Sequence, residues 1–198
     1  MNKLSRRTVL TGMGAIAVLP AMPAYAVTSG SAKRLVTKAV DEINTIINSG
    51  KAEAAMISDF EGVFSRYADV PIIARYTLGA DARSMSEAQH SRYAKAFSGY
   101  MARKWGGRFR EFEGGKIEVQ SARKVKSFIE VKTFAHLRGS SPFEVLFMVS
   151  DRGGSERFFN MYIEGVNLLL TERTEVQAML DARGGNVDRL IRDLPGVG

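Results

Sequence analysis

The chain has 198 residues, with 28 Lys and Arg against 21 Asp and Glu and no Cys. The lack of Cys excludes thiol catalysis, thiolate metal sites and disulfides, although a chain of this length can build a core without cross-links. Three basic residues and no acidic ones lie within residues 1–26, so residues 27–198 carry a net charge of only +4. No block of basic residues remains that would indicate nucleic-acid binding. The scattered Lys and Arg residues either keep the surface solvated or form a binding face for an anionic partner.

Residues 1–26 have the pattern of an export signal peptide. Basic residues precede an apolar stretch over residues 9–19, and Ala24-Tyr25-Ala26 has the form of a cleavage site. The pair Arg6-Arg7 resembles a twin-arginine signal, with Val9 where that pattern usually has Phe, and general secretion is the alternative. About 11 apolar residues are fewer than the roughly 20 that span a bilayer, which disfavours an uncleaved anchor. We therefore expect export, cleavage after Ala26, and one domain over residues 27–198.

Apolar residues at three- and four-residue intervals predict helices in the first half of this domain. The spacing of Ser86 and Gln89 fits a capping box, which predicts that a long helix begins there. Gly106-Gly107 should bend or end that helix, because each Gly costs about 1 kcal/mol relative to Ala in a helix interior. The three helices expected before it cover residues 33–48, 52–67 and 70–78.

From Lys116 the apolar period changes to two, which predicts β-strands. Short separators rich in Gly and Ser indicate an antiparallel meander. The four expected strands cover residues 117–120, 128–135, 143–150 and 157–163, and helical pattern resumes over 172–182 and 187–194.

The expected sheet has more apolar residues than one face needs. Ile129, Val131 and Thr133 share a face of the second strand, and strict alternation places Phe159, Met161 and Ile163 together in the fourth. In the third strand both faces are apolar, since Leu146 and Met148 lie opposite Val145 and Phe147. The second face must then be covered by helices, paired with another protein, or kept as a ligand cavity. A sheet sandwiched by helices without a cavity is the simpler alternative.

Residues typical of catalysis are few. Glu87 and His90 could form a helical pair, but this spacing is common on solvated helix faces. No cluster has metal-ligand spacing, and Ser140-Ser141 lacks the surroundings of a nucleophile elbow. Glu164 is expected to be a buried hydrogen-bond acceptor where a strand meets a helix. A small hydrolase or isomerase is therefore a weaker alternative to a binding protein, as is an adaptor that uses the apolar sheet face.

Two stretches of the chain resemble the MlaC family of exported phospholipid carriers, also called toluene-tolerance auxiliary proteins. The first runs from Ile73 to Gly79 and continues through Ser86, Gln89, Tyr93, Phe97 and Tyr100. The second runs from Ile163 to Leu168 and continues through Arg173, Gly184-Gly185 and Leu190-Ile191. The chain departs from the family at Asn167, where Ser is common, at Asn160, where an aspartate is common, and in lacking a Trp in the fourth strand.

The resemblance implies an α+β fold in which helices wrap around a curved four-stranded antiparallel sheet with an internal lipid cavity. Such a fold is similar to the nuclear-transport-factor-like cone. The implied function is to carry glycerophospholipid through the periplasm between an outer-membrane lipoprotein and porin complex and an inner-membrane ABC transporter complex, which maintains outer-membrane lipid asymmetry. Phospholipid would be cargo, and we expect no cofactor, metal or nucleic acid. We expect a monomer with transient contact to membrane surfaces.

The physical cost of exposed acyl chains indicates where such cargo must lie. Two chains with about 30 methylenes would cost roughly 24 kcal/mol in water, so the tails need a deep cavity while the headgroup stays at its mouth. Arg75 is the candidate for a phosphate contact at the mouth, and an ordinary salt bridge is the alternative. The candidate tail-facing residues, each with plain core packing as its alternative, are Val70, Ile73, Tyr76, Leu78, Phe97, Tyr100, Met101, Trp105, Val131, Phe147, Val149, Met161, Ile163 and Val166.

Overall fold

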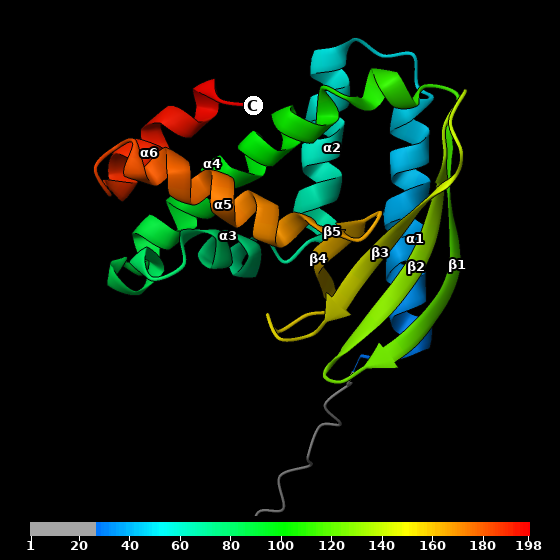
Figure 1. Ribbon diagram of the computed structural model, residues 1–198, viewed down its shortest axis with the longest axis horizontal. Helices are drawn as coiled ribbons and strands as arrows, with labels where there is room; N and C mark the ends of the chain where they lie inside the picture. The colour runs from blue at the N-terminus through cyan, green and yellow to red at the C-terminus, as the bar shows by residue number, and fades with distance from the viewer. Residues whose placement is uncertain (1–26) are drawn as a thin grey trace, which may run out of the picture.

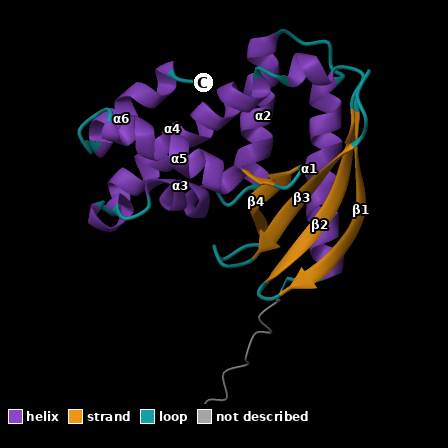
Figure 2. Ribbon diagram, in the orientation of Figure 1, coloured by secondary structure: helices purple, strands orange, loops and turns teal. Residues whose placement is uncertain are grey.

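The computed structural model describes residues 27–198, so the expected signal peptide lies outside the described residues. Helices and an antiparallel sheet form two groups, with the strands on one side and α3 to α6 on the other (Figures 1 and 2). The helices are α1 (Ser29–Ile47), α2 (Glu53–Tyr67), α3 (Val70–Leu78), α4 (Glu87–Gly106), α5 (Leu168–Asp181) and α6 (Val187–Asp193). The strands are β1 (Lys116–Val125), β2 (Phe128–His136), β3 (Phe143–Ser150), β4 (Arg157–Ile163) and β5 (Val166–Asn167). The α+β fold predicted from the sequence is confirmed.

Side-chain caps explain where the helices begin. The hydroxyl of Ser86 accepts a hydrogen bond from the backbone N–H of Gln89, and the Oε1 atom of Gln89 accepts one from the backbone N–H of Ser86, which is the predicted capping box. The predicted start of α5, residue 172, was four residues too late. The Oδ1 atom of Asn167 accepts from the N–H of Leu170 at 3.1 Å, so this cap starts the helix at Leu168.

The strands form a meander in the order β1-β2-β3-β4-β5. The two-residue β5 adds a fifth strand to the four that were predicted, and β1 continues to Val125, beyond the predicted residue 120. Pure alternation was also wrong for Phe158, because a register shift between Met148 and Val149 pairs Phe158 with Val149. This bulge places Phe158 on the same face as Met161 and makes it part of the core.

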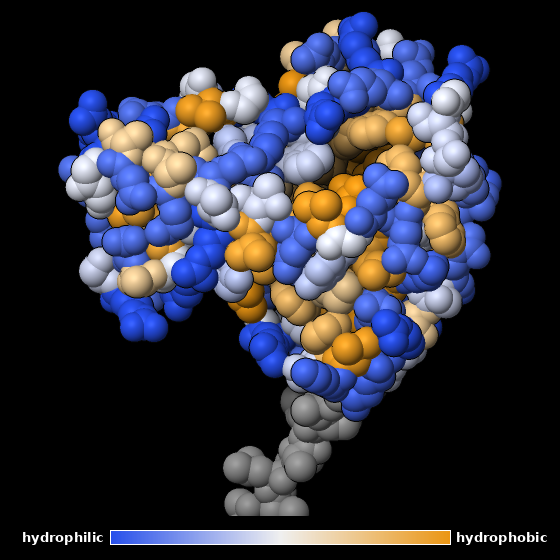
Figure 3. Space-filling model, in the orientation of Figure 1, coloured by the Kyte–Doolittle hydropathy of each residue, from blue (hydrophilic) through white to orange (hydrophobic). Residues whose placement is uncertain are grey.

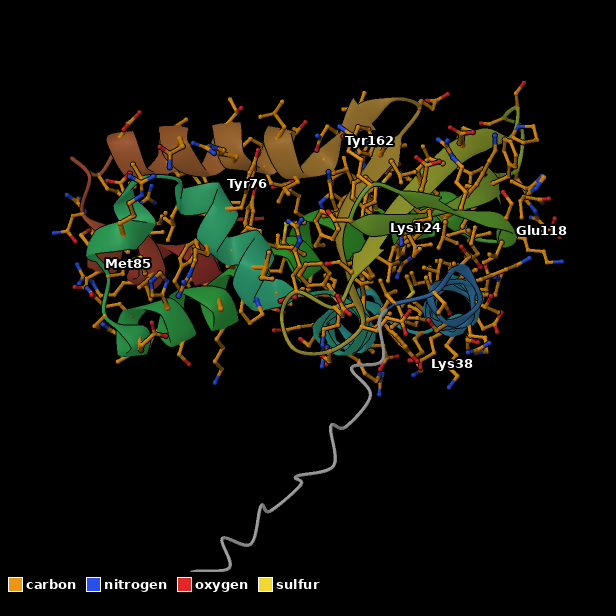
Figure 4. The ribbon with its side chains drawn as sticks, turned by 90° about the horizontal axis from the view of Figure 1, so that it is seen from below. Lys38, Tyr76, Met85, Glu118, Lys124 and Tyr162 are labelled. Atoms are coloured by element: carbon orange, nitrogen blue, oxygen red, sulfur yellow. The ribbon has the colours of Figure 1, made fainter. Side chains whose placement is uncertain are left out.

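Helix α1 lies across one face of the sheet, here called the inner face (Figure 4). Buried Ile129, Val131 and Thr133 of β2 point to this face, as their alternation predicted. The opposite, outer face carries Tyr162, which Figure 4 shows on the side away from α1. No helix in residues 27–198 is long and apolar enough to cross a membrane.

Strand β1, at one edge of the meander, is hydrogen-bonded to α1. The Nδ2 group of Asn44 donates to the carbonyl oxygen of Ile117 at 2.9 Å, and its Oδ1 accepts from the N–H of Ile117 at 2.8 Å. Lys33 donates to the carbonyl of Gln120 at 2.9 Å. These bonds satisfy backbone groups that an edge strand would otherwise expose to another chain.

Glu164 does not take the buried position that we expected. It is exposed and has a φ of 50° in the two-residue turn between β4 and β5, followed by Gly165 at 80°. Two consecutive residues with positive φ are what a tight hairpin requires. Glu164 is therefore a turn residue of the β4–β5 hairpin and not a buried hydrogen-bond acceptor.

Candidate functional site

The inner face of the sheet is not completely filled. Phe143, Met161 and Ile163 point to this face, yet they are only partly buried although α1 and α2 lie over it. The space-filling view shows the molecule hollowed between α2 and the strands, with hydrophobic residues gathered around the opening (Figure 3). An apolar surface that solvent reaches beneath a helical cover is suited to holding an apolar ligand.

A smaller apolar pocket lies where α2, α3, α4, β4 and α5 meet. Its volume is about 40 Å³, which is room for one or two water molecules and not for an acyl chain. We call it the wall pocket. Its lining residues are Phe64, Ile73, Met101, Phe158, Phe159, Asn160, Met161, Leu168, Leu169 and Glu172.

One charged side chain lines this wall pocket. Glu172 is 1% exposed, and its carboxylate lies 2.7 Å from the ammonium of Lys104. The same ammonium contacts Glu175 at 2.5 Å, and the hydroxyl of Tyr100 donates to both carboxylates at 3.3 and 3.0 Å. The group thus joins α4 to α5 with two carboxylates and one ammonium.

Burial and hydrogen bonds together set the pKa values of this cluster. Burial raises the pKa of Glu172, although the hydrogen bond and charge of Lys104 act in the opposite direction. Burial also acts to raise the pKa of Glu175, but the hydrogen bonds from Lys104 and Tyr100 outweigh it and lower that pKa. Burial raises the pKa of Tyr100 strongly, so its hydroxyl stays a donor at every physiological pH. Glu172 is therefore the carboxyl of the pair that is most easily neutralised.

Amide side chains fix the start of α5 against the wall pocket. The Oδ1 atom of Asn160 accepts from the N–H of Leu169 at 3.1 Å and from the N–H of Met161 at 2.7 Å. The Nδ2 group of Asn167 donates to the hydroxyl of Tyr162 at 3.1 Å. Asn160, and Asn167 through its cap to the N–H of Leu170, act as acceptors at positions where the family commonly has aspartate and Ser, which are also acceptors.

A separate groove of about 360 Å³ lies between α3 and α4. Arg75, Glu87 and His90 line it, together with Ile72 and Tyr93. The guanidinium of Arg75 is 3.6 Å from the Glu87 carboxylate, with both side chains mostly exposed, as the salt-bridge alternative anticipated. Because Ile73 lines the wall pocket and Arg75 follows two residues later, Arg75 lies on the other side of α3. Its predicted contact with a phosphate remains a prediction.

The structure places twelve of the fourteen predicted tail-facing residues in or against one hydrophobic cluster. Tyr76 and Val166 are instead 40% and 55% exposed. Trp105, Met161 and Ile163 are partly buried and accessible at the edge of the cluster. The remaining nine are buried: Val70, Ile73, Leu78, Phe97, Tyr100, Met101, Val131, Phe147 and Val149. Lipid contact by each of the fourteen stays a prediction.

Several residues of the site were not anticipated from the sequence. Lys104 and Glu172 are 68 positions apart, so no local pattern joins them, whereas the pair Glu172 and Glu175 at helical spacing was a visible signal. Within residues 27–198, no group of three or more His, Asp or Glu side chains could hold a metal ion.

Comparison with known proteins agrees with this architecture. A phospholipid-binding protein from Ralstonia solanacearum, solved in complex with a phospholipid, superposes with a TM-score of 0.69 at 17% sequence identity. The alignment covers 82% of this chain and 94% of that one, so the two share a fold. None of the curated proteins compared matches the sequence. The sequence model of the MlaC protein family matches residues 37–195, and the chain therefore belongs to the MlaC family.

Proposed function

We propose that this protein carries glycerophospholipid through the periplasm, as the soluble component of an ABC-type transport system that maintains outer-membrane lipid asymmetry. The observation that carries the proposal is the partly exposed apolar inner face, represented by Phe143, Met161 and Ile163 beneath a helical cover. Membership of the MlaC family and the fold shared with a protein solved with bound phospholipid support it. The export pattern of residues 1–26 supports a periplasmic location. The same findings favour a binding and transport protein over an enzyme.

Cargo of this kind requires more space than the wall pocket provides. Two acyl chains need to bury about 30 methylenes, and a pocket of about 40 Å³ holds none of them fully. The tails would enter the hollow on the inner face and displace side chains at its edge, such as Trp105 and Met161. We therefore propose that α4 and α5 move away from the sheet when lipid binds. Hydrogen exchange of these two helices should be faster in the lipid-loaded protein than in the delipidated one, because they lose packing contacts with the sheet.

The direct test is native mass spectrometry of protein purified without detergent, followed by organic extraction of the bound material. We expect a mass increase equal to one phospholipid or a small whole number of them, and lipid identification would give the headgroups carried. A clean apo mass that is unchanged after incubation with phospholipid vesicles would contradict the carrier function. That result would favour the adaptor, since it shares the fold and the apolar face but needs no lipid.

A further inference from the structure

The most exposed large hydrophobic side chains in residues 27–198 are Tyr76, Val166 and Leu170, at 40%, 55% and 51%. A single exposed apolar residue is ordinary on a protein surface, so their positions decide whether they matter. Val166 pairs with Ile163 at the accessible edge of the inner face, and Leu170 follows Leu169 of the wall pocket. All three thus belong to elements beside the candidate lipid site.

Arg173 joins two of these side chains into one surface. Its guanidinium lies over the ring of Tyr76, 5.1 Å from the ring centre. Arg173 follows Leu170 by three residues, so both lie on the same face of α5. Within residues 27–198 no ion pair involves Arg173. We call Tyr76, Val166, Leu170 and Arg173 the α5 patch.

The α5 patch lies on the side of the molecule that is away from α1. Figure 4 shows Tyr76 extending from α3 toward α5, on the opposite side of the fold from Lys38 of α1. The hollow over the inner face opens toward this same side, because Figure 3 shows its opening in the view in which α5 and β5 are in front. A flat surface that meets the α5 patch therefore also meets the mouth of the hollow.

We propose that the α5 patch docks on a lipid bilayer that contains anionic phospholipid. Leu and Val side chains can insert shallowly into the boundary between headgroups and acyl chains. Tyr is typical of this boundary, since its ring is apolar and its hydroxyl is polar. The unpaired guanidinium of Arg173 suits a lipid phosphate, and the net charge of +4 over residues 27–198 favours an anionic surface.

A bilayer fits this patch better than a protein partner does. The three exposed apolar side chains belong to three different elements, α3, β5 and α5, and a fluid headgroup layer accommodates them without a complementary shape. Docking in this orientation gives a physical advantage that rests on the proposed carrier function. Acyl chains could then pass between bilayer and hollow without crossing open water.

The test is flotation of the protein with vesicles of phosphatidylethanolamine and phosphatidylglycerol in a 3:1 ratio. Replacing Leu170 with glutamate should lower the bound fraction about fivefold, because it removes an inserting side chain and adds repulsion. Leu170→Glu should fold normally, since an acid in the first turn of α5 suits the helix dipole. Arg173→Gln should weaken binding to the same vesicles and reduce the effect of raising the salt concentration. Thr45→Glu, at an exposed site on α1, is the matched control and should bind as the wild type does.

Two results would overturn the docking proposal. One is wild-type protein that does not float with these vesicles; the other is Leu170→Glu and Arg173→Gln both floating as well as the wild type. In the second case, the α5 patch would be a docking site for a protein partner and not for a bilayer. Phospholipid content, measured by native mass spectrometry on the same samples, separates this proposal from the carrier function. If Leu170→Glu has a normal lipid content but floats weakly, the docking proposal is supported. If the wild-type protein contains no phospholipid, only the carrier function is contradicted.

Discussion

The ammonium of Lys104 lies 2.7 Å from the carboxylate of Glu172, although the two residues belong to different helices and Glu172 is 1% exposed. This contact places an ion pair in the wall of an otherwise apolar pocket. A buried charge is costly unless it is paired, so the contact holds α4 against α5 beside the wall pocket.

Removing the ammonium should therefore destabilise the fold. We expect Lys104→Met to lower the free energy of unfolding by about 3 kcal/mol at pH 8, because the carboxylate of Glu172 loses its main partner. The double variant Lys104→Met/Glu172→Gln should recover most of this loss. Urea unfolding followed by circular dichroism measures both. Lys51→Met is the control, since the exposed pair of Lys51 and Asp59 should contribute less than about 1 kcal/mol. Equal effects of Lys104→Met and Lys51→Met would show that the buried pair has no special role.

The raised pKa of Glu172 predicts a pH dependence of stability. The folded state binds this proton more tightly than the unfolded state does, so the stabilising contribution is complete below the unfolded pKa of about 4.3. It is then lost as the pH rises through the raised pKa of the folded state. Glu172→Gln cannot titrate, so its free energy of unfolding should fall less over this pH range than that of the wild type. Parallel curves for the two proteins above pH 4.3 would contradict the raised pKa.

Charge on the inner face of the sheet should prevent cargo binding. We expect Ile163→Glu to reduce the phospholipid that copurifies by about tenfold, because an unpaired carboxylate in the hollow opposes an apolar ligand. Leu146→Glu is the matched control on the outer face, where the new carboxylate would lie beside Lys132. Native mass spectrometry gives the bound fraction of each. Equal lipid loss in both variants would indicate general damage to the sheet and not a lipid site at Ile163.

Asn44 should stabilise the edge of the sheet. Its amide satisfies both backbone groups of Ile117, so we expect Asn44→Ala to cost about 2 kcal/mol. Thr45→Ala is the control, because the Thr45 hydroxyl bonds only to the carbonyl of Asp41 in its own helix. Thermal unfolding compares the two. A loss for Asn44→Ala no larger than that for Thr45→Ala would mean that water replaces the amide at the strand edge.

Gly153 should not tolerate a side chain. A Cβ atom there would overlap the carboxylate of Asp69, which is 4% exposed and caps α3. We expect Gly153→Ala to lower the free energy of unfolding by about 2 kcal/mol, and Asp69→Ser in the same chain to restore part of it with a shorter capping side chain. Gly196→Ala is the control, since no atom lies within 4 Å of its added Cβ. A neutral Gly153→Ala would show that the turn moves freely away from α3.

Local rules predicted the regular elements well where the deciding residues are neighbours in the chain. The bounds of α3 were predicted correctly, and the capping box at Ser86 marked the start of α4. The predictions were wrong where a local detail changed the period. The cap at Asn167 lengthened α5, and the bulge opposite Val149 turned Phe158 to the inner face. Neither detail alters the average apolar pattern, so periodicity could not detect it.

The candidate site depends more on tertiary structure than the fold does. The apolar pattern identified most residues of the main cluster, but it could not separate filled core from accessible wall. Phe97 and Met161 have the same apolar character in the sequence, yet Phe97 is 0% exposed and Met161 remains partly accessible. Exposure depends on which side chains from distant segments pack against each one.

The sequence by itself determined the amphipathic helices, the meander and the family signature, because these follow from side-chain spacing and caps within a few residues. Only the tertiary structure decided that Lys104 pairs with Glu172, that Arg75 lies across α3 from the wall pocket, and that Tyr76 meets Arg173. Those contacts join residues far apart in the chain, and packing of whole elements sets their distances. The hollow has the same origin, since it is space that the packed helices leave over the sheet.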